Sequence, residues 1–229
     1  AVSLAVFAYL AGFVGNFAKP TRLDGPAAGP LGAALAVNLA LIALFGAQHS
    51  AMARPAFKRA WTRIVPAPAE RSTYMLATNI VLAALFAFWR PLGGEVWTLE
   101  HPVARGVAYG LYAVGWAVVL TATFLLNHFD LFGLRQVWLH FRGRPYTTLP
   151  FATPLFYSRV RHPIYLGWMI VFWATPTMTL AHLLFAAGLT VYMLRAIRWE
   201  ERDLIELHPQ YAAHRQRVPM LLPRLGRAR

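Results

Sequence analysis

The sequence contains no cysteine. This absence excludes disulfide bonds, thiolate metal sites and cysteine nucleophiles, and it leaves the redox compartment open. Charged residues are also scarce: Asp, Glu, Lys and Arg make up 14% of the 229 residues, against roughly 25% in a typical soluble domain. Hydrophobic residues make up 58%, and the mean hydropathy is +0.44. This balance predicts an integral membrane protein.

Acidic residues are the scarcer charged class, with 9 Asp and Glu against 22 Lys and Arg, which gives a net charge of +13. In a soluble protein such an excess would suggest nucleic acid. Here the basic residues lie between and after apolar segments, and no recognition helix or stacking motif accompanies them. The pattern favours the positive-inside bias and contact with anionic lipid. We therefore expect a lipid bilayer as partner and no nucleic acid.

Several common motifs are missing. No two glycines have the G-x-G spacing, which disfavours a soluble-type nucleotide-binding fold, and there is no P-loop sequence. The eight histidines include no H-E-x-x-H, H-x-x-x-H or H-x-x-H-H pattern. A membrane zinc protease or a di-iron desaturase is therefore disfavoured, and we expect no metal site.

Long apolar segments dominate what remains. The segments cover residues 2–17, 31–47, 73–89, 103–126, 163–174 and 179–197. The fifth would reach only about 18 Å as a helix, short of a membrane core of about 30 Å, so five or six segments cross. Gly106 and Gly110 have a spacing that would let another helix approach closely. We predict an all-α, polytopic transmembrane helix bundle that ends in a helical hairpin and an amphipathic cytoplasmic tail from Trp199 onward.

The basic residues are unevenly distributed along this pattern. Residues 48–71, residues 128–160 and the C-terminal tail carry most of the Lys and Arg. In a six-segment topology these regions share one side, which the positive-inside rule assigns to the cytoplasm. We expect a multi-pass protein of a bacterial inner membrane with its active site on the cytoplasmic side. No polar linker divides the chain, so we expect a single domain over residues 1–229, with its catalytic part at about 128–223.

The hairpin opens with Arg161-His162-Pro163 and carries polar groups at its start. Proline in the first turn of a helix leaves free N–H groups nearby at the positive end of the helix dipole, where a carboxylate can bind. Tyr157 and Tyr165 flank this turn, and their aromatic faces attract a cation. The turn therefore suits a ligand that has both a carboxylate and a cationic centre.

The far end of the hairpin carries Glu200 and Glu201. A carboxylate there could accept both hydroxyls of a ribose, so with the turn at Arg161 the ends of the hairpin suit S-adenosylmethionine. Adjacent helical residues point about 100° apart, so the two glutamates cannot line one pocket equally. Taken singly, the tyrosines and His162 are also typical of interfacial anchors, and the glutamates of a solvated helix end.

The pattern Arg161-His162-Pro163-x-Tyr165-x-Gly167, followed by Glu200-Glu201, resembles the signature of integral-membrane methyltransferases, among them the isoprenylcysteine carboxyl and phospholipid N-methyltransferases. The tail, with Tyr211, Arg217-Val218-Pro219 and Leu222-Pro223, is similar too. In the carboxyl methyltransferases a carboxylate on the substrate side matches Glu200. The arginine that precedes it there falls at Ala196, so Arg195 or Arg198 would take its place.

A wider resemblance covers most of the chain. Gln48-His49-Ser50-x-Met52-Ala53-Arg54-Pro55, Asn127-His128-Phe129-Asp130 and Trp173-Ala174-Thr175-Pro176 resemble the methanethiol S-methyltransferases. These enzymes move a methyl group from S-adenosylmethionine to methanethiol, giving dimethyl sulfide. The resemblance implies cofactor contacts from the set Tyr157, His162, Pro163, Ile164, Tyr165 and the segment Leu149 to Ala152, to which the chemistry above adds Arg161 and Glu201.

The implied reaction is direct displacement at the sulfonium methyl by a thiolate. A simple thiol has a pKa above neutral, as cysteine does at about 8.5, so a cation or base must favour the nucleophilic thiolate. The candidates for this role are Arg195, Arg198, His49, His128 and His140. A narrow aromatic pocket would select a small thiol, and we expect it to be lined by Phe129, Phe132, Trp138 and Trp173.

Two alternatives remain at this point. A methyltransferase of the same superfamily could act on a lipid amine or a prenyl-cysteine carboxylate. The chain could instead be a non-enzymatic membrane protein such as a permease, although its charged groups sit at one membrane face and not at mid-span, where transporters place them. The sequence makes no prediction about oligomeric state.

Overall fold

We describe a computed structural model that covers residues 2–18 and 20–223. Residues 1, 19 and 224–229 of the expected domain lie outside this description. The elements run in the order α1 (Val2–Val14), α2 (Leu31–Ala53), α3 (Pro55–Trp61), the 3₁₀ turn η1 (Ala67–Ala69), α4 (Glu70–Phe88), β1 (Glu95–Thr98), α5 (Pro102–Leu126), α6 (His128–Leu131), α7 (Leu134–Phe141), the 3₁₀ turn η2 (Leu155–Ser158), α8 (Pro163–Trp173), β2 (Thr177–Thr179), α9 (Leu180–Leu207) and α10 (Gln210–Arg217).

Each predicted apolar segment forms a helix, which confirms the all-α membrane fold. Four helices are long and apolar enough to cross a membrane: α2, α4 with its preceding turn, α5 and α9. Helices α1 and α8 are apolar but shorter. The chain is an integral membrane protein whose two short helices are packed among four long ones.

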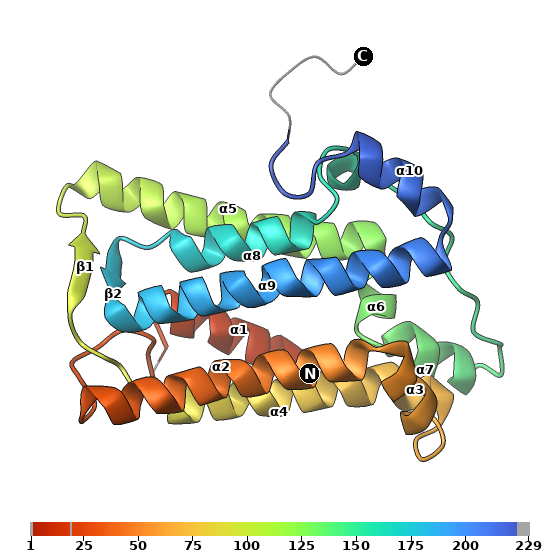
Figure 1. Ribbon diagram of the computed structural model, residues 1–229, viewed down its shortest axis with the longest axis horizontal. Helices are drawn as coiled ribbons and strands as arrows, with labels where there is room; N and C mark the ends of the chain where they lie inside the picture. The colour runs from red at the N-terminus through yellow and green to blue at the C-terminus, as the bar shows by residue number, and fades with distance from the viewer. Residues whose placement is uncertain (1, 19, 224–229) are drawn as a thin grey trace.

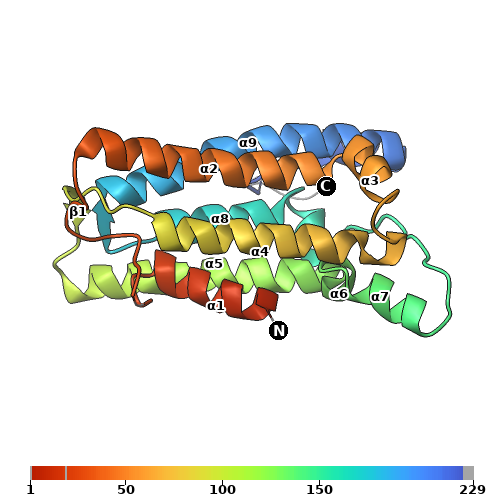
Figure 2. The same cartoon turned by 90° about the horizontal axis from the view of Figure 1, so that it is seen from below.

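The long helices lie side by side along one axis, with α8 against α5 and α2 against both α4 and α9 (Figures 1 and 2). Helices α3, α6, α7 and α10 gather at one end of this bundle, and β1 and β2 lie at the other (Figure 1). The three basic regions thus share one end, as their charge pattern predicted. We call this the basic end.

Helix α9 is longer than predicted. It continues past Ile197 to Leu207, so Glu200 and Glu201 lie within the helix and not in a surface tail. The residues after Ile197 contain no glycine or proline until Pro209, and Arg, Glu and Leu are good helix formers. The predicted start of the tail at Trp199 is therefore wrong, and the amphipathic tail proper begins with α10.

A short antiparallel pair of strands was not predicted. Glu95–Thr98 pairs with Thr177–Thr179 and ties the loop after α4 to the loop after α8. At this same end the buried Asn38 side chain of α2 donates to the Arg90 carbonyl (2.7 Å) and accepts from the Arg90 amide (2.9 Å). These contacts join the helices at the end opposite to the basic segments.

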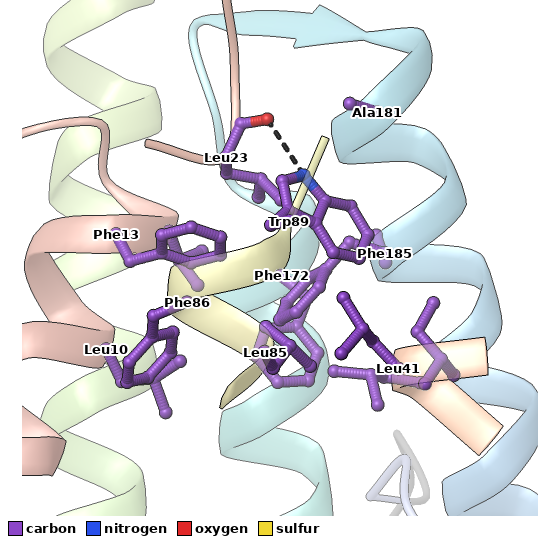
Figure 3. Close-up of a cluster of buried hydrophobic side chains, with 14 of the residues drawn as sticks. Leu10, Phe13, Leu23, Leu41, Leu85, Phe86, Trp89, Phe172, Ala181 and Phe185 are labelled. Carbon is purple, nitrogen blue, oxygen red and sulfur yellow. Dashed lines mark hydrogen bonds between the residues drawn. The ribbon is translucent and has the colours of Figure 1, made fainter. Parts of the chain in front are cut away.

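The hydrophobic core lies between α1, α2, α4, α8 and α9 (Figure 3). Phe13 of α1 packs against Phe86 of α4 and Phe185 of α9, with ring centroids 5.1 and 6.3 Å apart. Trp89 is buried here, and its indole N–H donates to the Leu23 carbonyl at 3.2 Å. This core fixes α9 against the N-terminal helices and so sets the position of its polar end.

Helices α5 and α8 cross closely at two glycines. A Cβ on Gly115 would come within 2.9 Å of the Val171 amide nitrogen, and a Cβ on Gly167 within 2.9 Å of the Val119 amide nitrogen. No helix of the described chain makes the close approach expected at Gly106 and Gly110, since a Cβ at either would meet no described atom within 4 Å. Both lie on an exposed face of α5, whereas Gly115 is buried.

Candidate functional site

The turn into α8 is held by the C-terminal segment after α10. The Arg161 amide donates to the Pro219 carbonyl at 2.9 Å, and the His162 amide donates to the Met220 carbonyl at 3.1 Å. The Arg161 guanidinium also donates to the Val218 carbonyl at 2.6 Å. Residues 218–220 therefore fix both the backbone and one side chain of the turn at the basic end.

Glu201 is the centre of a buried charge network. Its Oε1 accepts from Arg161 Nε at 2.7 Å and lies 3.1 Å from His162 Nε2, while its Oε2 lies 3.0 Å from Arg215 Nε. The Tyr211 hydroxyl donates to Oε1 at 3.4 Å. We expected Glu201 to contact the cofactor; both its oxygens have protein partners, and through them the side chain holds Arg161 and His162 in place.

Glu200 faces a different way, as the 100° step between helical neighbours requires. Its Oε2 accepts from the Tyr165 hydroxyl at 2.9 Å and lies 4.0 Å from His162 Nδ1. The Glu200 side chain is 41% exposed, whereas that of Glu201 is 6% exposed. The carboxylate available to a ligand is therefore Glu200.

Glu200 lines a cavity of about 400 Å³ at the basic end. Most of the predicted cofactor residues line it as well, namely Leu149, Ala152, Tyr157, Arg161, His162, Ile164 and Tyr165. Pro163 does not; it is buried as the first residue of α8 and turns the chain. Pro150 and Phe151, which belong to the expected segment Leu149 to Ala152, line the cavity too. The remaining lining residues, which sequence reasoning did not single out as contacts, are Leu126, Asn127, Asp130, Leu131, Thr153, Leu204, His208, Tyr211 and His214. Asn127, Asp130 and Tyr211 among them belong to the sequence motifs that resemble the family.

The electrostatics of this larger cavity follow from its burial. Burial raises the pKa of the Tyr157 and Tyr211 hydroxyls, so both phenols stay protonated at neutral pH. Burial lowers the pKa of His214, and the nearby Arg161 lowers it further, which keeps that imidazole uncharged. Across residues 2–18 and 20–223, no group of three or more His, Asp or Glu side chains is arranged to hold a metal ion. The cavity therefore offers aromatic faces with carboxylates and Arg161.

A second cavity, of about 170 Å³, lies among the helices. Its lining is mostly apolar and comes from Phe7, Leu10, Phe45, His49, Met75, Thr78, Leu82, Leu85, Tyr165, Trp168, Phe172, Phe185, Leu189, Tyr192 and Met193. Tyr165 is common to this list and to the lining of the larger cavity. The two cavities therefore meet at one side chain.

The predicted aromatic lining of a thiol pocket is wrong. Phe129 and Trp138 are exposed on the short helices at the basic end, and Trp173 is 38% exposed at the end of α8. Phe132 packs against Phe7 but lines neither cavity. The aromatic rings that do line the smaller cavity come from α1, α2, α8 and α9. Apart from Tyr165, no sequence motif marks them, because only helix packing brings them together.

His49 is the one predicted thiolate-stabilising candidate that lines the smaller cavity. Its ring stacks on Phe45 with centroids 5.3 Å apart, and its Nε2 lies 2.8 Å from the Tyr74 hydroxyl. The imidazole is thus held by a phenol and an aromatic face at the edge of an apolar chamber.

The other candidates lie elsewhere. Arg195, Arg198 and His140 are exposed, and none lines either cavity. His128 stacks on Phe124 with centroids 4.3 Å apart, and burial lowers its pKa, but it too lines neither cavity. The geometry gives these four residues no contact with a thiol in the smaller cavity.

Comparison with known proteins matches the chain along nearly its whole length. It is 49% identical over 220 residues to a methanethiol S-methyltransferase of Crocosphaera subtropica, covering 96% of this chain and 86% of that protein. It is 50% identical over 223 residues to a methanethiol S-methyltransferase of Mycobacterium tuberculosis, covering 97% and 91%. It is also 33% identical to nurim of Rattus norvegicus over 187 residues, covering 78% and 71%. No family model and no solved structure matches the chain.

Proposed function

We propose that this chain, which belongs to the methanethiol S-methyltransferase family, methylates methanethiol. The product is dimethyl sulfide, and S-adenosylmethionine is the methyl donor. The observation that carries the proposal is the pair of cavities that meet at Tyr165. One has charged and polar side chains in its wall and is large enough for a nucleoside, and the other is small and mostly apolar. A methyl group can pass between two ligands only where their sites touch.

The larger cavity fits the donor. Its volume of about 400 Å³ falls within the range of small-molecule sites. The start of α8 with Arg161 and His162 suits a carboxylate, the rings of Tyr157 and Tyr165 suit a cationic sulfonium, and Asp130 or Glu200 can accept ribose hydroxyls. When bound there, S-adenosylmethionine would supply an already activated methyl group.

The smaller cavity fits the acceptor. At about 170 Å³ it is below the volume of typical drug-sized sites, so it admits a short-chain thiol and excludes a lipid head group or a prenylated peptide. Its apolar walls exclude water and hold the sulfur close to Tyr165, and such positioning is the main catalytic contribution that the reaction needs. This size limit favours a thiol over the lipid amine and prenyl-cysteine alternatives.

The basic end supports a cytoplasmic location for the larger cavity. Residues 48–71, 128–161 and 199–223, which include the short helices of this end and their connections, carry most of the arginines in the described part of the chain, and the positive-inside rule places such segments in the cytoplasm. We therefore propose an inner-membrane enzyme of a single domain that takes its donor from the cytoplasm.

The reaction is tested by headspace gas chromatography of purified protein. Dimethyl sulfide is expected only when S-adenosylmethionine and methanethiol are both present. Butanethiol and phosphatidylethanolamine are expected to react at least about tenfold more slowly, because each added methylene must fit a cavity of only about 170 Å³. Binding of S-adenosylhomocysteine without dimethyl sulfide would reject the thiol acceptor, and absence of binding would reject the methyltransferase function and favour a non-enzymatic protein.

The donor site is tested separately with His162→Ala. This change removes a buried imidazole from the cavity wall and from Glu201, so the affinity for S-adenosylhomocysteine is expected to fall by about tenfold, or about 1.4 kcal/mol. Isothermal calorimetry in detergent measures it. His140→Ala, at an exposed residue of α7, is the matched control and should bind normally; equal affinities for the two variants would contradict the site.

A further inference from the structure

We propose that Tyr165 and Glu200 form the route by which the thiol proton leaves the apolar cavity, an inference that rests on the proposed function. A thiol must lose its proton to become a good nucleophile. Methanethiol carries that proton into a chamber whose walls are mostly apolar. The proton therefore needs a defined path out.

The path is visible in the contacts of Tyr165. This residue lines both cavities, so an acceptor in one and a donor in the other would both lie against its side chain. The hydroxyl donates to Glu200 Oε2 at 2.9 Å. Glu200 lines only the larger cavity, and its side chain is 41% exposed. A phenol at the boundary thus connects the chamber to a solvated carboxylate.

The proton moves from the thiol to Glu200 without leaving a phenolate on Tyr165, because the Tyr165 oxygen gains one proton as it gives another away. The S–H bond of the thiol breaks as its proton moves to the Tyr165 oxygen, and the proton already on that oxygen moves to Glu200 Oε2. The thiol sulfur keeps the electron pair of the S–H bond and uses it to bond the methyl carbon. The bond between that carbon and the sulfonium sulfur breaks, and its electron pair stays on the sulfur of the product S-adenosylhomocysteine. Glu200, now a carboxylic acid, returns its proton to water.

The neighbouring polar groups are less suited to this role. His49 and Tyr192 line the smaller cavity only, and each has a protein partner there: His49 lies 2.8 Å from the Tyr74 hydroxyl, and the Tyr192 hydroxyl lies 3.1 Å from Ser50 Oγ. His162 lies 4.0 Å from Glu200 Oε2 but directs its other nitrogen to Glu201. Tyr165 alone of these four residues touches both chambers.

The experiment compares methanethiol with methaneselenol, which has nearly the same size but a much more acidic proton. A variant that lacks only the proton route should fail with the thiol and succeed with the selenol, because the selenol is already ionised. We expect Tyr165→Phe and Glu200→Gln to lower dimethyl sulfide formation by about 100-fold or more, in the range of general acid–base contributions. Dimethyl selenide formation should fall by less than about tenfold. The loss of rate with the thiol should therefore exceed the loss of rate with the selenol by at least about tenfold.

Binding supplies a readout that does not depend on turnover. Tyr165→Phe should bind S-adenosylhomocysteine within about threefold of the wild type, since it keeps the ring and loses only a hydroxyl; this corresponds to less than about 1 kcal/mol. Glu200→Gln changes a carboxylate of the donor cavity, so it is judged by comparing its loss with the thiol to its loss with the selenol. Tyr192→Phe removes a phenol from the same chamber, and His49→Asn removes its imidazole. Each control should change the thiol and selenol rates by the same factor.

The proposal fails on any of three results. Equal losses with thiol and selenol in Tyr165→Phe would assign the residue to packing, and loss of S-adenosylhomocysteine binding would assign it to the donor site. A thiol-selective loss in His49→Asn or Tyr192→Phe, with none in Tyr165→Phe, would move the proton route to that residue. Failure of the proposed function is distinct, because the wild type would then form no dimethyl sulfide at all.

Discussion

Glu201→Ala is expected to abolish detectable binding of S-adenosylhomocysteine and to lower the free energy of unfolding by about 3 kcal/mol. The carboxylate joins Arg161 of the turn before α8, Arg215 of α10 and the His162 side chain. Arg161 and His162 are nearly buried, with side chains 11% and 4% exposed. Removing their shared anion leaves buried polar and charged groups without a partner, which costs far more than the pair itself contributes.

Two variants calibrate this result. Glu206→Ala removes an exposed carboxylate from the same helix and should change stability by less than about 0.5 kcal/mol. Glu201→Gln keeps the shape and one acceptor oxygen, so it should fall between alanine and the wild type. Unfolding followed by intrinsic fluorescence in detergent, with calorimetry of ligand binding, measures both quantities. Normal binding by Glu201→Ala would show that the turn holds without its anion.

The prediction for Glu201 also marks where sequence reasoning reached its limit. The sequence pattern placed Glu200 and Glu201 at the end of the last hairpin and indicated that one of them would face away from any pocket. It could not decide which, because the rotation of α9 about its axis is set by packing of Phe185 and its neighbours far from the glutamates. A rotation of α9 by about 100°, the step between neighbouring helical residues, would exchange the places of Glu200, which faces the cavity, and Glu201, which holds the charge network.

Hydrophobic runs were the most informative feature of the chain. They placed the six helices within a few residues, except where α2 runs on to Ala53 and α9 runs on through Glu200 to Leu207. The polar turn Arg161-His162-Pro163 and its flanking tyrosines located most of the wall of the larger cavity. These features are local in sequence, and so the sequence pattern could predict them.

The smaller cavity could not be predicted in this way. Its walls come from α1, α2, α4, α8 and α9, and each contributes ordinary apolar residues that look like any core or lipid-facing position. The aromatic residues that seemed suitable, such as Trp138 and Phe129, lie near the catalytic motif in sequence but on exposed faces. Proximity along the chain is a poor guide when a pocket forms between helices distant in sequence.

The second large effect is expected at the crossing of α5 and α8. Gly167→Ala should lower the free energy of unfolding by about 1–3 kcal/mol, the usual cost of overpacking, and should reduce dimethyl sulfide formation. The new Cβ would lie 2.9 Å from the Val119 amide nitrogen and 3.0 Å from the Gly115 carbonyl oxygen. Backbone atoms cannot rotate away as a flexible side chain can, so the two helices must separate.

Separation of these helices would reach the site directly, since Tyr165 lies on α8 two positions before Gly167 and lines both cavities. Gly106→Ala and Gly110→Ala make the same chemical change on α5 where a Cβ meets no described atom. Both should be neutral or raise stability by up to about 1 kcal/mol, because alanine is the better helix former. Gly167→Ala could instead unfold at the same temperature as these controls and keep its activity. In that case the crossing tolerates a methyl group, and the position of Tyr165 does not depend on the close approach of α5 and α8.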